Sequence, residues 1–283
     1  MPWGTALKGG PDLEGSRFEL ISVPARDSQS GGDQLHTVAL LDRLRPDLPP
    51  FSIHFERPQV QARLRKSELK RELLIRATGL LENIDQRSNS LMSVWDTTAG
   101  LGVESVLMAA AGAKVIGFER EPLLTALAQN ALERWLCSVP SELELKFIGE
   151  EFTADPVQIK NWISKHGEPA VLYFDPMFFS EAIETKSLPK KGMQVLREIT
   201  RAETADAFLV RLNASVEALV RLVSENKSVR FVVKQPRSSD KQQSRLFRVE
   251  QLAPRLPNRK FRRYWVTGKL VQFEILRVDP VES

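Results

Sequence analysis

The sequence has few of the residues that build disulfides and metal sites. Its 283 residues include one cysteine, Cys137, and three histidines that lie far apart, at positions 36, 54 and 166. A single cysteine cannot form an internal disulfide and is typical of a reducing compartment. One cysteine and three scattered histidines also do not supply the clustered ligands of a zinc site. We therefore expect a cytoplasmic protein without a metal ion.

Long apolar runs and a large charge of one sign are also missing. No segment approaches the roughly 20 apolar residues that span a membrane. The first residues, MPWGTALKGGPDLEGS, do not place an apolar segment after a basic one, so we expect no secretory signal. The 40 basic and 36 acidic residues leave a formal net charge of +4, which suits an anionic partner without demanding one. No membrane association is predicted.

What the chain does contain is a regular alternation of strand and helix patterns from about residue 91 onward. Buried strand patterns occupy residues 91–96, 113–119, 143–149, 170–175 and 229–234. Helical patterns between them indicate an α/β fold with a doubly wound parallel sheet. Two last patterns, 260–267 and 270–278, meet at Gly268-Lys269 and predict an antiparallel hairpin. We expect a seven-stranded, mostly parallel sheet with this hairpin at its C-terminal end.

The N-terminal part has a different pattern. Residues 1–16 are rich in glycine and small polar residues and are expected to be mobile. Residues 17–90 predict a small α+β element, and residues 91–283 form the main domain. Within the small element we expect strands at 18–25 and 51–56, a helix across 36–45 and basic helical structure across 58–87.

A glycine-rich turn follows the first strand of the alternation. The strand runs into DTTAGLG, with Gly100 and Gly102 just before a predicted helix. Glycines at a strand-to-helix turn let a ligand approach the backbone, at the edge where open α/β sheets bind ligands. The second strand ends at Glu119, whose carboxylate can accept hydrogen bonds from both ribose hydroxyls of a nucleoside. Together these features predict a nucleoside site.

Two nucleoside cofactors share this layout. A dinucleotide fingerprint needs a third glycine, where this chain has Ser105, and the acid Glu104 disfavours a pyrophosphate beside it. S-adenosylmethionine has no phosphate and carries an ammonium and a sulfonium, which acids such as Asp96 and Glu104 attract. We therefore predict S-adenosylmethionine, with a nicotinamide oxidoreductase as the weaker alternative.

The fourth strand ends in VLYFDPMFFS, residues 171–180. The exocyclic amine of a base is a poor nucleophile, because its lone pair is delocalised into the ring. Two acceptors for its hydrogens, the Asp175 carboxylate and the Pro176 carbonyl, would stabilise positive charge developing on nitrogen. The ring of Phe178 can stack on the extruded base. We predict Asp175, Pro176 and Phe178 as the catalytic residues of an amine methyltransferase.

These motifs resemble one enzyme family. DTTAGLG, GFEREP, LYFDPMF, SLPKKGMQVLREI and VRFVVKQP occur in this order within residues 51–275, as in ribosomal RNA small subunit methyltransferase J. The resemblance implies a class I, Rossmann-like methyltransferase fold. It implies methyl transfer from S-adenosylmethionine to N2 of a guanine in small-subunit ribosomal RNA. The implied partner is ribosomal RNA or the small ribosomal subunit.

The resemblance also implies positions that contact the cofactor, in addition to Asp96, Gly100 and Gly102. They are Val103, Glu104, Glu119, Arg120, Glu150, Glu151 and Asp175. Several residues depart from the family pattern, which has Arg-Asp at 103–104, two serines at 150–151, proline at 179 and Arg-Pro at 235–236. The chain has Val103-Glu104, Glu150-Glu151, Phe179 and Gln235-Pro236 instead. We therefore expect a divergent member with altered cofactor and base pockets.

Basic residues that could hold RNA gather in three places. They are Arg63, Arg65, Lys66, Lys70 and Arg71; Lys190 and Lys191; and Arg259, Lys260, Arg262 and Arg263, beside Tyr264 and Trp265. Such groups neutralise phosphates, although each cluster also fits a solvated face and the two aromatics also fit a core. We predict Lys190, Lys191 and Lys234 as RNA contacts. Cys137, in an apolar helix, is predicted to be packed.

Two other functions share these features. A methyltransferase acting on adenine N6 of a nucleic acid, or on a protein amide, would use the same Asp175 motif. A non-catalytic RNA-binding protein would result if the acids Glu150 and Glu151 spoil the cofactor pocket.

Overall fold

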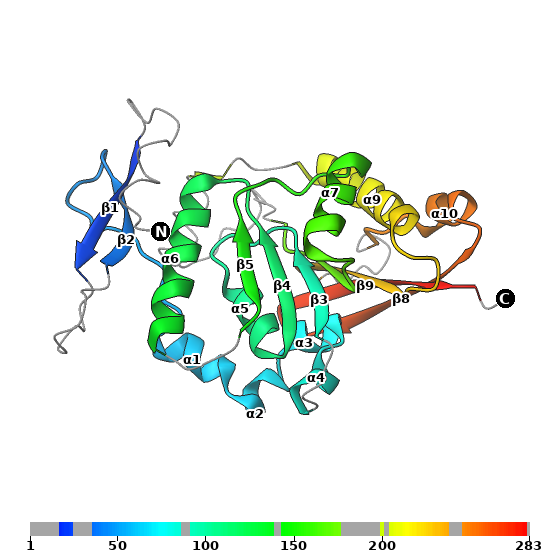
Figure 1. Ribbon diagram of the computed structural model, residues 1–283, viewed down its shortest axis with the longest axis horizontal. Coiled ribbons are helices and arrows are strands. Elements are labelled where there is room, and N and C mark those ends of the chain that lie inside the picture. Colours follow the sequence, from blue (N-terminus) through cyan, green and yellow to red (C-terminus); the bar gives the residue numbers. More distant parts are fainter. Residues whose placement is uncertain are drawn as a thin grey trace.

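The computed structural model describes residues 17–24, 36–85, 91–138, 143–176, 199–200, 204–237 and 245–281. Within them, a large sheet carries helices on both faces, and a two-stranded sheet lies beside helix α6 (Figure 1). The segment 1–16, Phe178, Phe179, Lys190 and Lys191 lie outside the described residues. The division of the chain at residues 90 and 91 stays a prediction.

The large sheet has seven strands in the order β5-β4-β3-β6-β7-β9-β8. Their bounds are β3 Met92–Asp96, β4 Ala113–Phe118, β5 Leu145–Ile148, β6 Val171–Phe174, β7 Val229–Pro236, β8 Arg259–Thr267 and β9 Val271–Pro280. Strands β5, β4, β3, β6 and β7 pair in parallel, whereas β9 pairs antiparallel with both β7 and β8. The predicted mostly parallel sheet with an antiparallel C-terminal hairpin is confirmed.

The helices of the alternation cover both faces of this sheet. They are α5 Val103–Ala110, α6 Pro122–Ser138, α7 Pro156–His166, α9 Ala205–Leu222 and α10 Val249–Leu252, with a 3-10 turn at Ala253–Arg255. The α7 helix begins at Pro156, where Asp155 caps it by accepting the Val157 N–H at 3.0 Å. Gly112, at a φ of 87°, turns the chain after α5 toward β4.

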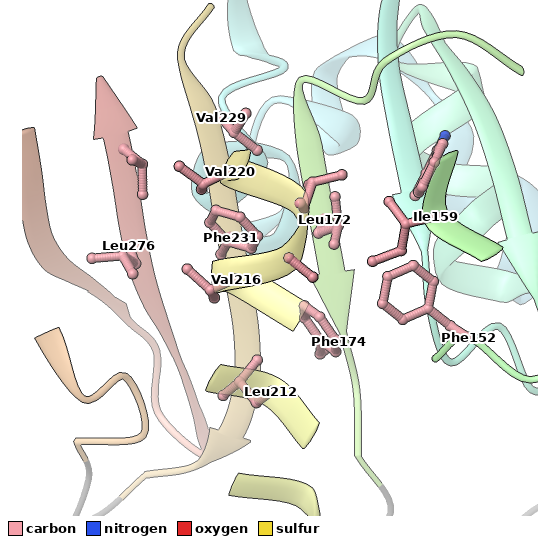
Figure 2. Packing of buried hydrophobic residues seen from close by; sticks show 14 of the residues in the cluster. Phe152, Ile159, Leu172, Phe174, Leu212, Val216, Val220, Val229, Phe231 and Leu276 are labelled. Carbon is pink, nitrogen blue, oxygen red and sulfur yellow. The ribbon is translucent and has the colours of Figure 1, made fainter. Parts of the chain in front are cut away.

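Strand β6 shows how the two layers are packed. Its four residues are fully buried, and successive side chains point to opposite faces. Leu172 and Phe174 belong to the apolar layer under α7 and α9 (Figure 2). Val171 and Tyr173 belong to the layer on the other face. Because β6 is buried on both sides, its end is held in a fixed position relative to the neighbouring strands.

The small sheet consists of β1 Phe18–Pro24 and β2 His36–Asp42, paired antiparallel along their length. Asn130 attaches it to α6, because its side-chain oxygen accepts the Val38 N–H at 2.9 Å and its nitrogen donates to the His36 carbonyl at 3.1 Å. The helix predicted across 36–45 is therefore wrong. Residues 38–41 are all apolar and fit either period, and pairing with β1 selects the strand.

The segment between the two sheets also differs from expectation. Residues 51–56, predicted as a strand, contribute only a bridge from Phe51 to Leu40. The basic segment forms four short helices, α1 Pro58–Leu64, α2 Lys66–Leu69, α3 Leu73–Thr78 and α4 Leu81–Asp85. Extended backbone at Arg65 (ψ 136°) and Glu72 (ψ 125°) separates the first three of them. The α3 helix packs Leu74 and Ile75 against the same face of the sheet as α5.

Helix α6 corrects the prediction for Cys137, which is exposed. The buried side of this helix runs through Leu124, Ala128, Ala131 and Trp135. Cys137 lies two residues beyond Trp135, about 200° around the helix, so it faces solvent. No helix within the described residues has the length and apolar character needed to cross a membrane.

Candidate active site

The candidate site lies at the carboxyl edge of the sheet, between β3 and β6. The chain fills β4 and β5 on one side of β3, then crosses to β6 and β7 on the other side. The crevice between β3 and β6 is the point where the strand order reverses, and open α/β sheets bind ligands at such points. The glycine turn after β3 and the Asp175 motif after β6 both reach this crevice.

Two threonines of the glycine turn tie it to the end of β6. Thr97 donates its N–H and its hydroxyl to the Tyr173 carbonyl, each at 2.9 Å. The Asp175 N–H donates to the Thr98 hydroxyl at 2.7 Å. The sequence reasoning gave neither threonine a role, because these bonds reach a strand that lies far away in the sequence. The nucleoside turn and the catalytic motif thus form one bonded unit.

The two glycines of the turn do different things. Both have left-handed backbone, with φ of 54° at Gly100 and 76° at Gly102. A Cβ on Gly100 would find only the Thr98 carbonyl within 4 Å, at 3.9 Å, so the space beside it is open to a ligand. A Cβ on Gly102 would lie 2.6 Å from the Phe147 ring. Gly100 therefore leaves room for a ligand, and Gly102 allows the core to close under the turn.

Replacing Gly102 by alanine is expected to lower the free energy of unfolding by roughly 2–4 kcal/mol, from left-handed backbone and overpacking together. Gly112→Ala is the matched control, because it also has positive φ (87°) but its Cβ would meet atoms no nearer than 3.5 Å. The control should lose only about 1–2 kcal/mol. Urea denaturation of both variants measures the difference, and equal losses would contradict the close packing of Phe147.

Asp96 stabilises the glycine turn through hydrogen bonds to its buried carboxylate. Its side chain is buried, accepting the Ser105 hydroxyl at 2.6 Å and the Thr98 N–H at 3.2 Å. Burial raises the pKa of Asp96 to about 7, although these two hydrogen bonds oppose the shift. Ser105, which stands at the third position of a dinucleotide fingerprint, is thus engaged by Asp96. Asp96 holds the turn together, and its predicted contact with the cofactor stays a prediction.

Glu119 follows β4 and reaches across to the glycine turn. One carboxylate oxygen accepts the Gly100 N–H at 2.8 Å, and the other accepts the Glu121 N–H at 2.9 Å. Burial raises the pKa of Glu119, and the two backbone N–H groups oppose the shift. Each oxygen keeps a lone pair for a further donor. This carboxylate is therefore oriented for a diol bound over Gly100.

Among the predicted cofactor contacts that follow β4 and β5, Arg120 and Glu151 lie close together, whereas Glu150 bonds to a residue of α7. The Arg120 guanidinium lies 3.7 Å from the Glu151 carboxylate, and the Trp162 indole N–H donates to Glu150 at 3.0 Å. Both acids that depart from the family pattern thus have partners on this chain. Val103 begins α5, and its partly buried side chain packs against the core.

Lys234 lies opposite Asp175 across the β6–β7 pair. These strands pair in parallel, with Phe174 opposite Val233, so Asp175 and Lys234 are the next positions along them. The Lys234 ammonium donates to the Asp175 carboxylate at 2.6 Å and to the Glu104 carboxylate at 3.4 Å. Lys234, predicted to contact RNA, therefore directly engages the predicted catalytic residue. The strand register needed to foresee this cannot be read from the sequence.

The Lys234 ammonium is shared by two carboxylates, those of Asp175 and Glu104. Partial burial raises the pKa of Asp175 to about 6, with Lys234 opposing the shift and Glu104 adding to it. Burial disfavours the ammonium, yet Asp175 and Glu104 raise the pKa of Lys234 to about 12. The ion pair therefore holds at neutral pH, where both groups are charged.

A cavity of about 300 Å³ opens beside this ion pair. It lies between α1 to α3 and the strands β6, β7 and β9, and its lining includes Glu104, Tyr173 and Lys234. Arg63, also in the lining, is held by Glu72 through two bonds of 2.6 and 3.1 Å. Burial and the charges of Asp175 and Glu104 keep the pKa of Tyr173 well above its ordinary value. The space next to Asp175 thus has the volume of a small ligand site.

A family model described as "Putative SAM-dependent methyltransferase" matches residues 19–250. The chain belongs to this family. The match includes the glycine turn, Glu119, Asp175 and Lys234. The prediction of S-adenosylmethionine as cofactor is confirmed by this membership, and the oxidoreductase alternative is excluded.

Individual relatives agree with the family. Ribosomal RNA small subunit methyltransferase J of Alkalilimnicola ehrlichii is 32% identical over 179 residues, which are 61% of this chain and 64% of that protein. The protein of the same name from Dechloromonas aromatica is 29% identical over 227 residues, covering 78% of this chain and 83% of that one. The resemblance to this methyltransferase family that the motifs predicted is confirmed. The chain spans just under two thirds of the first of these relatives.

The crystal structure of a SAM-dependent methyltransferase from Neisseria gonorrhoeae has the same fold. Its TM-score is 0.50 at 20% identity, over 84% of this chain and 78% of that chain. Together with the strand order, this likeness confirms the class I, Rossmann-like fold.

The residues of the crevice fit the family's cofactor. Gly100 leaves space for a nucleoside, and Glu119 is oriented toward a diol there. Glu104 and Asp175 gather negative charge near the turn, which suits a ligand with an ammonium and a sulfonium. Within the described ranges, no group of three or more His, Cys, Asp or Glu side chains is arranged to hold a metal ion.

Lys234→Met is expected to shift the acid limb of the pH–rate profile upward. In the native protein, activity should fall below about pH 6, because protonation of Asp175 removes its charge. Without the ammonium at 2.6 Å, the ionised carboxylate loses its nearby cation, and the limb should rise by roughly one to three pH units. Single-turnover methyl transfer, measured across pH for the native protein and for the variant, gives the acid limb of each.

Lys234→Arg is the control, because it keeps a cation beside Asp175 and should leave the limb within about half a unit of its native position. Asp96 titrates in the same region, with a pKa of about 7, but Lys234 donates no hydrogen bond to it in the described structure. The shift caused by Lys234→Met therefore assigns the limb to Asp175. An unmoved limb contradicts that assignment.

Proposed function

We propose that the protein transfers a methyl group from S-adenosylmethionine to the exocyclic N2 amine of a guanine in small-subunit ribosomal RNA. The relatives named ribosomal RNA small subunit methyltransferase J support this substrate. A ribosomal RNA substrate also supports a cytoplasmic location for the enzyme.

The observation that carries the proposal is the bond between the two halves of the site. The Asp175 N–H is held by Thr98 of the cofactor turn at 2.7 Å. The Asp175 carboxylate and the Pro176 carbonyl therefore stand at a fixed place beside the turn that binds the methyl donor. An amine brought to these acceptors is also brought to the donor, and positioning of this kind supplies much of the rate enhancement of bimolecular reactions.

When bound, the cofactor supplies a methyl group on a sulfonium. After transfer, its sulfur is that of a neutral thioether. Asp175 and Pro176 accept the two N2 hydrogens, draw the lone pair of N2 out of the ring system and stabilise the positive charge that develops on it. Transfer forms the N–C bond, breaks the C–S bond and releases one proton from N2. The Asp175 carboxylate, with a pKa of about 6, can accept that proton and pass it to water.

The remaining roles follow from position. The 300 Å³ cavity beside Lys234 and Tyr173 offers space next to Asp175 for part of the substrate. Phe178 is proposed to stack on the base, and Lys190 and Lys191 to contact RNA phosphates. Glu119, Arg120, Glu151 and the Val103 backbone are proposed to hold the cofactor.

The test is transfer of tritiated methyl groups by the full chain to separate RNA, DNA and protein fractions. Label in small-subunit ribosomal RNA, recovered as N2-methylguanosine by nucleoside mass spectrometry, supports the proposal. Label in N6-methyladenosine or in protein alone overturns the substrate and keeps the reaction class. Calorimetry with S-adenosylhomocysteine addresses the non-catalytic alternative, because absent binding at millimolar ligand would contradict any methyltransferase.

A further inference from the structure

The four cations at the start of β8 divide between its two faces. Arg259, at the first residue, donates to the carbonyls of Glu225 and Lys227 at 3.0 and 2.9 Å. Arg263 donates to the Phe247 carbonyl at 2.9 Å and pairs with Glu250 at 3.7 Å. These two arginines connect β8 to the segments around α9 and α10, so their presence has a structural explanation.

The cations and the tyrosine on the other face of β8 are more exposed to solvent. Strand alternation places Lys260, Arg262 and Tyr264 on the opposite face, in line with Val266, which packs in the α3 and α5 layer. The Arg262 side chain is 56% exposed and Tyr264 is 37% exposed. The sequence left Tyr264 and Trp265 open between core and surface, and the structure exposes Tyr264. A tyrosine beside two cations on an open strand face is a common arrangement for stacking a base.

Arg262 also belongs to a row of three arginines across adjacent strands. Arg230 of β7 lies opposite Arg277 of β9, which lies opposite Arg262 of β8. Like charges directly opposite each other destabilise a sheet. Arg230 lies against the end of α3, where it donates to the Ala77 carbonyl at 3.4 Å. The row therefore needs a compensating anion or a functional reason.

One anion meets this row within the described part of the chain. Asp279 accepts from Arg262 at 2.6 Å and from Arg277 at 2.7 Å. Against the effect of burial, bonds from Ser228, Arg262 and Arg277 lower the pKa of Asp279 to about 2. One permanent anion among three arginines leaves an excess of two positive charges, and the neighbouring Lys260 adds a third.

Protection of an edge strand explains only part of this surface. Exposed edges are often blocked by charged side chains, lysine above all, and Lys260 fits that use. The nine residues of β8, RKFRRYWVT, contain four cations and no acid. A surface with an excess of positive charge and an exposed aromatic ring fits a polyanion that carries planar bases.

We propose that one surface of the C-terminal hairpin docks the phosphate backbone of the RNA substrate. This hairpin surface consists of Lys260, Arg262, Tyr264 and Arg277. This inference rests on the proposed function and names a surface for the same substrate. Arg230, Val232 and Lys234 lie on the same face of β7. The four residue steps from Arg230 to Lys234 span about 13 Å. RNA held on the hairpin surface is therefore within a short reach of the crevice. The cations neutralise phosphates, and Tyr264 stacks on one base.

The test compares two double variants of the full chain that lose equal charge. Lys260→Gln with Arg262→Gln removes the two exposed cations of the hairpin surface. Lys146→Gln with Lys160→Gln is the control, because both lysines are exposed and lie on β5, the opposite edge strand, and on α7. The KM for small-subunit ribosomal RNA and its salt dependence are measured by tritiated methyl transfer.

The hairpin variant should raise KM about tenfold at moderate salt, leave kcat unchanged and flatten the slope of log KM against log salt by about 1.4–1.8, since each of the two lost cations accounts for about 0.7–0.9. The control should change KM by less than about twofold. Tyr264→Ala should raise KM by about fivefold or more without changing the salt slope, because stacking is not ionic. An unchanged KM and slope in the hairpin variant overturn the proposal.

Two further measurements separate the docking role from the effect of the Asp279 bond and from the proposed function. Arg262→Lys retains the charge and should keep the native salt slope; a loss as large as that of the hairpin variant would trace the effect to the Asp279 bond and overturn the docking role. Wild-type protein that fails to methylate RNA overturns the proposed function instead. RNA affinity by mobility shift then tests the hairpin surface alone, and native affinity in the hairpin variant overturns it.

Discussion

Asp175→Ala is expected to reduce the rate of methyl transfer by about 10²–10³-fold, the effect of removing one preorganised polar group from a charged transition state. The substrate nitrogen becomes positive during transfer, and Asp175 is the charged acceptor that the fold places beside the glycine turn through Thr98. Affinity for S-adenosylhomocysteine should persist, because Glu119 and Gly100 are untouched. Single-turnover transfer to RNA and calorimetry with S-adenosylhomocysteine measure the two effects separately.

Asp175→Asn is the matched control for shape. An amide keeps one acceptor oxygen of similar position but no charge, so its rate should lie between those of the native protein and the alanine variant. Thermal unfolding checks that Lys234, which then pairs with Glu104 alone, does not destabilise the fold. Unchanged turnover in the alanine variant would refute the role assigned to Asp175.

Glu119→Ala is expected to weaken binding of S-adenosylhomocysteine by about a hundredfold or more. Two hydrogen bonds from ribose hydroxyls to a carboxylate are each worth roughly 1.5–3 kcal/mol, and 1.4 kcal/mol is a factor of ten. The change also frees the Gly100 N–H, which Glu119 now fixes at 2.8 Å. Calorimetry gives the dissociation constant directly.

The neighbouring acid provides the comparison. Glu121→Ala removes a carboxylate two residues away, whose backbone N–H rather than its side chain serves Glu119. We expect binding within about twofold of native for this variant, in line with ordinary surface substitutions. If the two variants bind equally well, Glu119 does not hold the ribose.

The sequence was sufficient for those parts of the site that depend on strand ends. Gly100, Glu119 and Asp175 each follow a strand of a parallel sheet, and the carboxyl ends of parallel strands share one edge. The alternation of strands and helices therefore predicted both the sheet and the meeting of these residues. Cross-strand register is different, because it is set by packing over the whole sheet. For this reason Lys234 was predicted to contact RNA, and its bond to Asp175 was missed.

Other misses have equally local causes. His36–Asp42 was predicted as a helix because its apolar residues fit both periods, and a partner strand at Phe18–Pro24 decides the outcome. Thr97 and Thr98 were missed because their bonds run to β6, which lies far away in the sequence. Arg262 and Arg263 are adjacent in the sequence, yet one is exposed and the other bonds to the Phe247 carbonyl. Strand alternation puts them on opposite faces of β8, and the packing of the segment around α10 against one of those faces determines which arginine is covered.

The Thr98 bond has a thermodynamic consequence for the order of events. A ligand that orders the glycine turn also orders the Asp175 backbone, because the Thr98 hydroxyl holds both. Whichever ligand binds first meets the entropic cost of that ordering, and the second then binds to an assembled site. The affinities for the methyl donor and for the proposed RNA substrate are therefore linked equilibria, and the linkage acts equally in both directions. By the same linkage, we expect the spent donor to be retained more tightly while the methylated product still occupies the crevice.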